Sequence, residues 1–268
     1  MIRRSLDVLD RPEIVRILFH PRAEPPGGDP VPGALPVRIL VASDVAVGGK
    51  IYIAGLESPI ILYFHGNGEI ASDYDSIAPY YTRRGMTLFV VDYRGYGLSD
   101  GVPCATTLIE DAVAVYNQTG YLLTQRGLSY PDLFVMGRSL GSAAAIEVAY
   151  RAGADIAGLI LESGFAHTFD LLQRLAPTPL PPAEEARDGF GNLEKISRVT
   201  VPCLFIHGQR DTLIPPADGL ALRDACGSGH KRMVLIPGAG HNDLLAHGLM
   251  TYFDAIRRFV FKIVPPET

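Results

Sequence analysis

The sequence lacks tryptophan, has only three cysteines in 268 residues, and contains no apolar run of the roughly 20 residues that cross a bilayer. Cys104, Cys203 and Cys226 are odd in number and widely spaced, which fits neither a disulfide framework nor a zinc knuckle. Charged residues follow Arg3 and Arg4 where a signal peptide needs an apolar stretch. These absences predict a cytoplasmic protein with no integral membrane segment.

An excess of positive charge is also missing. The sequence has 24 Lys and Arg against 29 Asp and Glu, which gives a formal net charge of −5. A nucleic-acid-binding protein needs a basic surface for the phosphate backbone. We therefore expect no nucleic-acid partner.

The sequence does contain an alternation of short apolar runs and helical periodicity. The runs predict eight strands, at 37–42, 50–56, 60–64, 87–92, 133–136, 158–161, 203–207 and 233–236. Helical periodicity covers 108–123, 142–150, 220–225 and 251–263. The first two runs half-alternate, as in an antiparallel pair, whereas the later runs are continuously apolar, as in parallel strands covered on both faces. The predicted fold class is α/β, with a doubly wound, mostly parallel, eight-stranded sheet.

Two segments interrupt this alternation. Residues 1–36 join a short amphipathic start to a stretch with six prolines between Pro21 and Pro36, and we interpret them as an N-terminal leader and loop. Residues 165–199 contain an apolar half-helix followed by four prolines, and we interpret them as a small lid above the sheet. We expect one domain over residues 37–268.

Ser139 has the sequence context of a nucleophile. It is the centre of a Gly-x-Ser-x-Gly pentapeptide, residues 137–141, between an expected strand and an expected helix. A nucleophile elbow requires that context, because the sharp turn exposes the hydroxyl and the helix directs N–H groups toward the substrate. Residues 97–101 match the same pattern around Ser99, but Pro103 denies that serine an immediate helix. We therefore predict that Ser139 is the nucleophile and that Ser99 lies in a loop.

A nucleophilic serine needs a base, and the base needs an acid that orients it. Asp211 and His241 follow Ser139 in the order Ser, Asp, His, and each comes directly after an expected strand. Glu162 is a rival acid, because it also ends an expected strand. We predict Asp211 as the acid, since it occupies the later and more usual position.

Two backbone N–H groups must stabilise the negative oxygen of the reaction intermediate. One is expected from Leu140, the residue after the nucleophile. The other is expected from the turn after the strand at 60–64, with Asn67 as the candidate. The glycines beside Asn67 allow the main chain to approach a substrate closely.

The same turn supports a second interpretation. Gly66, Gly68 and Ala71 fit the Gly-x-Gly-x-x-Gly/Ala fingerprint of a dinucleotide-binding fold, and Asp92 ends the next strand, where a ribose-binding acid would stand. A nucleotide-cofactor-dependent oxidoreductase is therefore one alternative, although it leaves the ordered serine, aspartate and histidine unexplained. A hydrolase-like binding module without catalysis is the other.

Several longer motifs surround these residues. They are His-Gly-Asn-Gly at 65–68, Val-Asp-Tyr-Arg-Gly-Tyr-Gly-Leu-Ser at 91–99, Gly-Arg-Ser-Leu-Gly at 137–141, the positions Phe190, Asn192, Leu193 and Ile196, and the pair Val201-Pro202. From residue 59 onward, the chain resembles a branch of small serine hydrolases in the α/β-hydrolase superfamily. The resemblance implies an α/β-hydrolase fold with Ser139, Asp211 and His241 as a catalytic triad.

Members of that branch include esterases, thioesterases and enzymes that remove acyl groups from proteins. The resemblance implies hydrolysis of carboxylic ester or thioester bonds in a small-molecule acyl substrate through a covalent acyl-enzyme, with no cofactor and no metal. Phe165, Phe169 and Leu172 of the expected lid either line an acyl pocket or pack on the sheet. A proline-rich lid favours a small, rigid pocket, so we expect short to medium acyl chains.

Overall fold

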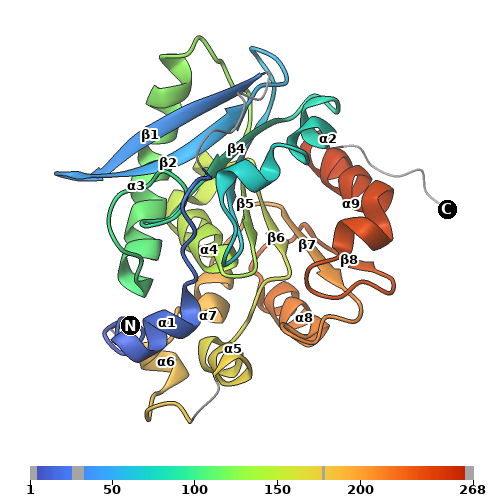
Figure 1. Ribbon diagram of the computed structural model, residues 1–268. Coiled ribbons are helices and arrows are strands. Elements are labelled where there is room, and N and C mark those ends of the chain that lie inside the picture. Colours follow the sequence, from blue (N-terminus) through green and yellow to red (C-terminus); the bar gives the residue numbers. More distant parts are fainter. Residues whose placement is uncertain (1–4, 26–32, 177–178, 263–268) are drawn as a thin grey trace.

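An eight-stranded sheet is the centre of the computed structural model, which describes residues 5–25, 33–176 and 179–262 (Figure 1). The strands are β1 (Ala34–Ala42), β2 (Val45–Tyr52), β3 (Ile60–Phe64), β4 (Thr87–Val91), β5 (Leu133–Arg138), β6 (Gly158–Glu162), β7 (Cys203–Gly208) and β8 (Lys231–Ile236). Their spatial order is β1-β2-β4-β3-β5-β6-β7-β8. β2 pairs antiparallel with both β1 and β4, and the pairs from β4 to β8 are all parallel. The predicted α/β fold with a mostly parallel eight-stranded sheet is confirmed.

The central strands are mostly apolar because both of their faces are buried. In β3, Ile60, Leu62 and Phe64 belong to one hydrophobic core, whereas Ile61 and Tyr63 belong to a second core on the opposite face. All five side chains are at most 1% exposed. The position of β3 in the middle of the sheet therefore follows from its continuous apolar run.

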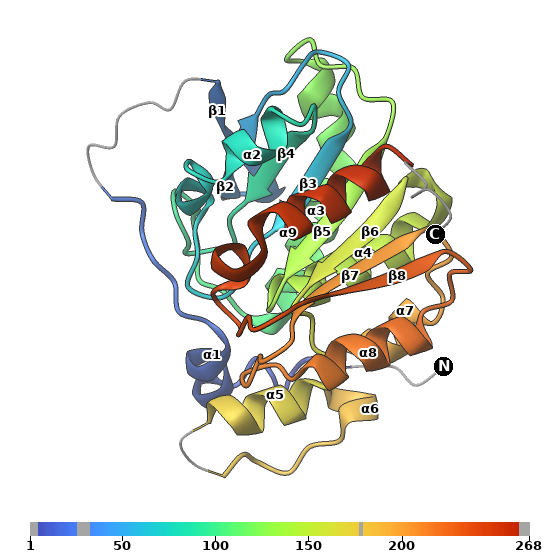
Figure 2. The same ribbon diagram turned by 90° about the vertical axis from the view of Figure 1, so that its right-hand side faces the viewer.

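Helices cover the two faces of the sheet as separate layers, with α9 in front of the strands and α3 and α4 behind them in Figure 2. One layer holds α3 (Ala105–Thr124), α4 (Gly141–Ala152) with its extension η2 (Gly153–Asp155), α7 (Asn192–Ile196) and α8 (Pro216–Ala225). The other holds α2 (Ala78–Thr82), α9 (Leu244–Val260) and the 3-10 helix η1 (Ala71–Tyr74). This layering leaves the loops at the strand ends free to carry a site.

The second strand begins earlier than the sequence predicted. β2 covers Val45–Tyr52 instead of 50–56, because Gly48 and Gly49 belong to the strand. A Cβ on Gly49 would lie 2.6 Å from the carbonyl oxygen of Val90 on β4. The glycine therefore marks a close approach of two strands and not a strand boundary.

The last helix also begins earlier than predicted. α9 starts at Leu244 instead of residue 251 and contains a kink at Gly248, whose φ of −151° is not helical. The kink interrupts the apolar periodicity, so the sequence revealed only the second part of the helix. The predicted end at residue 263 lies outside the described residues.

The N-terminal segment packs against the body of the protein. α1 (Pro12–Leu18) and the residues around it bury Leu9, Ile14 and Leu18 in the same core as α3 and α4. β1 begins at Ala34, inside the expected leader, and residues 26–32 lie outside the described residues. The division at residue 36 stays a prediction.

The expected lid, residues 165–199, forms α5 (Thr168–Leu175), α6 (Glu185–Asp188) and α7. α1 and α5 lie side by side beyond one edge of the sheet (Figure 2). Asp218 of α8 accepts a hydrogen bond from the backbone N–H of Ala166 at 3.0 Å, and Thr168 accepts one from the backbone N–H of Phe190 at 2.9 Å. The first bond connects the segment to α8, and the second joins two parts of the segment to each other. Residues 177 and 178 lie outside the described part, and a lid function stays a prediction.

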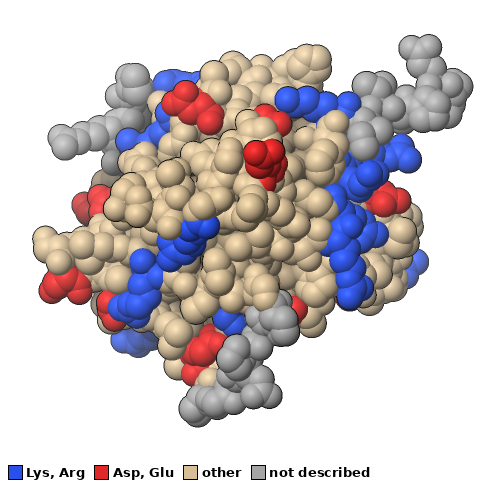
Figure 3. Space-filling view, turned by 90° about the horizontal axis from the view of Figure 1, so that it is seen from above, with Lys and Arg blue, Asp and Glu red and all other residues tan. Residues whose placement is uncertain are grey.

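The face seen in Figure 3 carries its Lys and Arg side chains in several separate groups with a broad uncharged area between them. This face therefore presents no continuous basic surface. Within the described ranges, none of the helices is long and apolar enough to cross a membrane. The absence of a nucleic-acid partner and the cytoplasmic location stay predictions.

Candidate active site

The turn between β5 and α4 holds Ser139 in a strained conformation. The φ of Ser139 is +51°, in the left-handed region that L-residues rarely adopt. A Cβ on Gly137 would lie 2.3 Å from the carbonyl oxygen of Gly141, and a Cβ on Gly141 would lie 2.2 Å from the carbonyl oxygen of Phe64. Both glycines are therefore necessary for the sharp turn that holds the serine hydroxyl at the end of β5.

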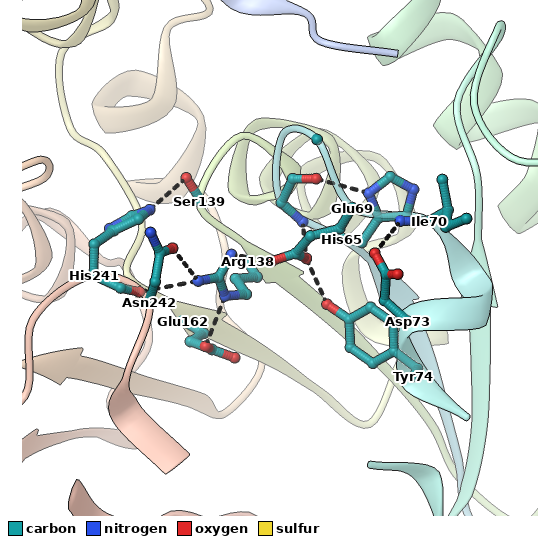
Figure 4. A network of polar contacts seen from close by, with 12 residues as sticks. His65, Glu69, Ile70, Asp73, Tyr74, Arg138, Ser139, Glu162, His241 and Asn242 are labelled. Atoms are coloured by element: carbon teal, nitrogen blue, oxygen red, sulfur yellow. Dashed lines mark hydrogen bonds and ion pairs between the residues drawn. The ribbon is translucent and has the colours of Figure 1, made fainter. Parts of the chain in front are cut away.

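His241 links Ser139 to Asp211. His241 Nε2 lies 3.0 Å from Ser139 Oγ (Figure 4), and His241 Nδ1 lies 2.7 Å from Asp211 Oδ2. An ionised carboxylate can only accept a hydrogen bond, so the proton is on Nδ1 and Nε2 accepts the serine hydroxyl. The three side chains come from the loops after β5, β7 and β8. The structure thus brings both Ser139 and Asp211 within hydrogen-bond distance of His241.

Asp211 is surrounded by hydrogen-bond donors. Its Oδ1 accepts from the backbone N–H groups of Leu213 at 3.0 Å and Ile214 at 2.9 Å, and His207 Nε2 lies 3.4 Å from its Oδ2. Burial acts to raise the pKa of Asp211, but the hydrogen bonds from His207 and His241 and from the backbone outweigh it and hold the pKa well below its usual range. The carboxylate is therefore ionised and accepts from His241 at neutral pH.

Glu162, the rival acid, has other partners. Its Oε1 accepts from Arg138 Nε at 3.1 Å, and its Oε2 accepts from the hydroxyl of Tyr252 at 2.6 Å. Both oxygens are thus engaged away from Nδ1 of His241, which bonds Asp211. The geometry favours Asp211 as the acid.

Leu140 and Asn67 are the residues expected to supply the oxyanion N–H groups. Within the described part of the chain, their backbone N–H groups donate no hydrogen bond. The side chain of Asn67 is fixed, because its Oδ1 accepts from the backbone N–H of His20 and from the hydroxyl of Tyr96, both at 2.8 Å. The turn after β3 is therefore held by the N-terminal segment. Sequence reasoning missed His20, since it lies in the expected leader.

Ser99 lies in an irregular loop after β4 and has no strand-turn-helix context. Its Oγ accepts a hydrogen bond from the backbone N–H of Gly48 at 2.8 Å. The hydroxyl thus connects this loop to β2. The second Gly-x-Ser-x-Gly match therefore has a structural explanation.

The glycine turn at 66–68 lacks the features of a dinucleotide site. The helix after it, η1, has only four residues, whereas a pyrophosphate is bound at the N-terminus of a longer helix. Asp92 is 4% exposed, and its carboxylate accepts from the backbone N–H of Ala71 at 2.7 Å instead of facing solvent. The short helix and the buried Asp92 therefore argue against a nucleotide-cofactor-dependent oxidoreductase. The residues described here also bring together no group of three His, Cys, Asp or Glu side chains that could hold a metal ion.

The three lid side chains have different surroundings. Phe165 and Leu172 are fully buried, and the ring of Phe165 packs edge-on against that of Phe190 at 6.0 Å between centroids. Phe169 is half-buried and lines a surface groove that also includes Leu180. In this conformation Phe165 and Leu172 present no surface to a ligand. An acyl pocket formed by these side chains stays a prediction.

A cavity of about 170 Å³ lies beside His241. Its polar lining includes Glu69, Arg138, Glu162, Asn242, Tyr63, Tyr74 and Tyr252. Burial acts to lower the pKa of Arg138, but the neighbouring carboxylates Glu69 and Glu162 outweigh it and raise the pKa above its usual value. Arg138 is therefore a fixed positive charge next to the nucleophile. Sequence reasoning missed it, because the nucleophile motif accepts any residue at that position.

The amino-acid sequence is similar to a known protein family and to known proteins. The family model described as serine aminopeptidase, S33, matches residues 57–179. Human alpha/beta hydrolase domain-containing protein 17B is 31% identical over 206 residues, which are 75% of this chain and 65% of that protein. The chain thus spans just under two thirds of the length of this relative. Protein bem46 of Schizosaccharomyces pombe is 30% identical over 210 residues, which are 75% of this chain and 67% of that protein.

The fold has counterparts among solved structures. An esterase of Pyrococcus furiosus superposes with a TM-score of 0.71 at 17% identity, over 89% of this chain and 98% of the esterase. At this level of identity the likeness concerns the fold alone.

Proposed function

Because the chain belongs to the α/β-hydrolase superfamily, we propose that it is a serine hydrolase that cleaves carboxylic ester or thioester bonds. The observation that carries the proposal is the chain of two hydrogen bonds from Ser139 through His241 to Asp211, at 3.0 and 2.7 Å. A serine hydroxyl is a weak nucleophile unless a base removes its proton during attack. The arrangement supplies that base and an acid that orients it.

Acylation begins when Ser139 Oγ attacks the carbonyl carbon of the substrate. The hydroxyl proton moves to His241 Nε2, and the charge that forms on the imidazole is stabilised by the carboxylate of Asp211. The carbonyl oxygen becomes an oxyanion that accepts hydrogen bonds from the backbone N–H groups of Leu140 and Asn67. When the intermediate collapses, His241 gives the proton to the leaving alcohol or thiol, and the acyl group stays on Ser139.

Deacylation repeats these steps with water. His241 takes a proton from a water molecule, whose oxygen attacks the acyl carbon, and then returns the proton to Ser139 as the carboxylic acid leaves. Each proton thus passes through one nitrogen, Nε2. The reaction needs neither a metal nor a cofactor.

The substrate we propose carries a short to medium acyl chain. Phe165 and Leu172, which could extend an apolar pocket, are fully packed against their neighbours. This packing leaves no deep apolar tunnel between them and supports a small acyl group over a long one.

The test compares Ser139→Ala with the matched variant Ser99→Ala. We expect Ser139→Ala to lose on the order of 10⁴-fold in hydrolysis of a short p-nitrophenyl ester, because the residues of a triad act as a unit. Ser99→Ala should keep most of the activity, since among the described residues the hydroxyl of Ser99 bonds the backbone N–H of Gly48 and no residue of the candidate triad. A fluorophosphonate should label the wild type stoichiometrically at Ser139. Similar rates in the two variants, or a wild type that is neither labelled nor active as in a non-catalytic module, would contradict the proposal.

A further inference from the structure

The guanidinium of Arg138 bonds four groups around the candidate triad (Figure 4). Nε donates to Glu162 Oε1 at 3.1 Å, and Nη1 donates to Glu69. Nη2 donates to the carbonyl oxygen of His241 at 2.9 Å and to Asn242 Oδ1 at 3.0 Å. The side chain is only 12% exposed. Arg138 therefore has a direct bond to the backbone of the catalytic base.

The partners of Arg138 come from three different strand ends. Glu69 follows β3 in the turn that holds the candidate oxyanion N–H, Glu162 ends β6, and His241 lies between β8 and α9. Arg138 itself ends β5, directly before Ser139. A guanidinium is planar and has its donors in a fixed arrangement, so it sets the relative positions of the groups that it bonds. One side chain thus connects the loops that carry the nucleophile, the base and the oxyanion turn.

The carboxylates that hold Arg138 are themselves fixed. Glu69 Oε2 accepts from the backbone N–H of Gly66 at 2.8 Å and from the hydroxyl of Tyr74 at 2.7 Å. A Cβ on Gly66 would lie 2.5 Å from Nη1 of Arg138, so the guanidinium packs directly on the turn after β3. Glu162 is held by Tyr252. The anchors are rigid, so the contact from Arg138 to His241 has little freedom to move.

We propose that Arg138 is a positioning residue that holds His241 in line with Ser139, an inference that rests on the proposed function. Asp211 fixes the imidazole ring of His241, whereas Arg138 fixes the backbone of the same residue. Without the bond from Arg138, the imidazole ring of His241 still bonds Asp211, but its position relative to Ser139 is no longer fixed. A misplacement of about 1 Å costs roughly 10²-fold in rate.

The first test variant is Arg138→Lys, which keeps a positive charge between Glu69 and Glu162 and therefore protects the fold. Glu162, Glu69 and the carbonyl oxygen of His241 bond three separate nitrogens of Arg138. The donors of lysine all lie on one nitrogen at the end of a flexible stem, so they do not reach these three positions together. With a short p-nitrophenyl ester we expect kcat to fall roughly tenfold with an unchanged KM. The rate constant for fluorophosphonate labelling should fall in parallel, because it depends on the same serine and base.

The second variant is Arg138→Ala, which enlarges the cavity beside His241. We expect kcat to fall about 10²-fold. Guanidinium chloride at millimolar concentration should restore part of kcat in a saturable way, because the free guanidinium can occupy the space of the missing head group. Methylammonium chloride at the same ionic strength should not, since it lacks the planar set of donors.

Arg94 offers a matched control. Its Nε and Nη2 donate to Asp111 of α3 at 2.7 and 2.8 Å, and its side chain is 18% exposed, so Arg94→Ala also removes a partly buried ion pair. Among the contacts of the described residues, this pair does not involve His241. We expect kcat of Arg94→Ala to stay within about threefold of the wild type and to be insensitive to guanidinium.

The inference is supported if both Arg138 variants lose kcat at constant KM and guanidinium rescues the alanine variant. It is overturned if folded Arg138→Lys and Arg138→Ala keep the kcat and labelling rate of the wild type, or if Arg94→Ala loses as much as Arg138→Ala. Ser139→Ala separates this failure from that of the proposed function. If Ser139→Ala is inactive while the Arg138 variants are fully active, only the positioning role is wrong; if Ser139→Ala keeps its activity, the proposed function fails and this inference fails with it.

Discussion

Replacement of Asp211 by asparagine tests which acid orients His241. The amide oxygen of asparagine can still accept from the backbone N–H groups of Leu213 and Ile214, which bond Oδ1 at 3.0 and 2.9 Å. The amide nitrogen then faces His241 Nδ1, where the carboxylate oxygen lay at 2.7 Å. Because a donor now meets a donor, the imidazole takes the other tautomer, with the proton on Nε2. In that tautomer Nε2 cannot accept the proton of Ser139.

The expected loss follows from this change of tautomer. We expect kcat of Asp211→Asn to fall about 10³–10⁴-fold, which is about 4–5.5 kcal/mol of transition-state stabilisation. KM should change little, because the side chain of Asp211 is fully buried and offers no surface to a substrate. Glu162→Gln keeps one acceptor oxygen, which can face Arg138, while its amide NH2 can donate to the hydroxyl oxygen of Tyr252. Because the change weakens charge-assisted hydrogen bonds but leaves Asp211 in place, we expect a loss of about tenfold or less.

Initial rates with a short p-nitrophenyl ester give kcat and KM for both variants, and thermal unfolding shows whether each is folded. A larger loss in Glu162→Gln than in Asp211→Asn would show that the wrong carboxylate has been chosen. A folded Asp211→Asn protein that loses tenfold or less would refute the tautomer argument itself.

Three further predictions concern stability and substrate. Gly141→Ala should lower the free energy of unfolding by about 1–3 kcal/mol in urea titrations, because the new Cβ would lie 2.2 Å from the carbonyl oxygen of Phe64. The control is Gly229→Ala, whose new Cβ would have no heavy atom of a non-adjacent described residue within 4 Å, and it should change this free energy by less than about 1 kcal/mol. The pKa of Asp211 is lower in the folded state than in the unfolded state, where it is about 3.9. Ionised Asp211 therefore stabilises the protein above about pH 4, and this contribution is lost as the pH falls further. The difference in unfolding free energy between wild type and Asp211→Asn should shrink below about pH 4. Among p-nitrophenyl esters and acyl thioesters of graded length, short to medium chains should be hydrolysed fastest, and a preference for chains of about 16 carbons would contradict the small acyl group that we propose.

The central sheet was predictable because strands buried on both faces are continuous runs of apolar residues in the sequence. Every residue of β3 is apolar, and each is at most 1% exposed. Two of the errors occurred where glycine serves packing and not a turn. Gly49 lies inside β2 against β4, and Gly248 bends α9, so both interrupt a pattern that the backbone continues.

The candidate triad was predictable for a different reason. In a parallel sheet the carboxyl ends of the strands meet at one edge, so Ser139, Asp211 and His241 could be named from their places after strands. Arg138 bonds His241, which is 103 positions away in the sequence, and His20 bonds Asn67, which is 47 positions away. No periodicity or spacing encodes such pairs, because each depends on how separate loops approach one another in the folded protein.

The apolar side chains in and before α5 show how one pattern serves two purposes. Phe165, Phe169 and Leu172 are four and three residues apart, a spacing typical of one helical face whether that face lines a pocket or packs on a core. In the structure α5 begins at Thr168, so Phe165 precedes the helix. The burial of Phe165 and Leu172 fits the second purpose, while Phe169 is left at the rim of the surface groove. A long acyl chain could contact the buried pair only if α5 moved, and the hydrogen bond from Ala166 to Asp218 opposes that movement. The chain-length preference of the enzyme therefore reports on whether α5 stays in place during catalysis.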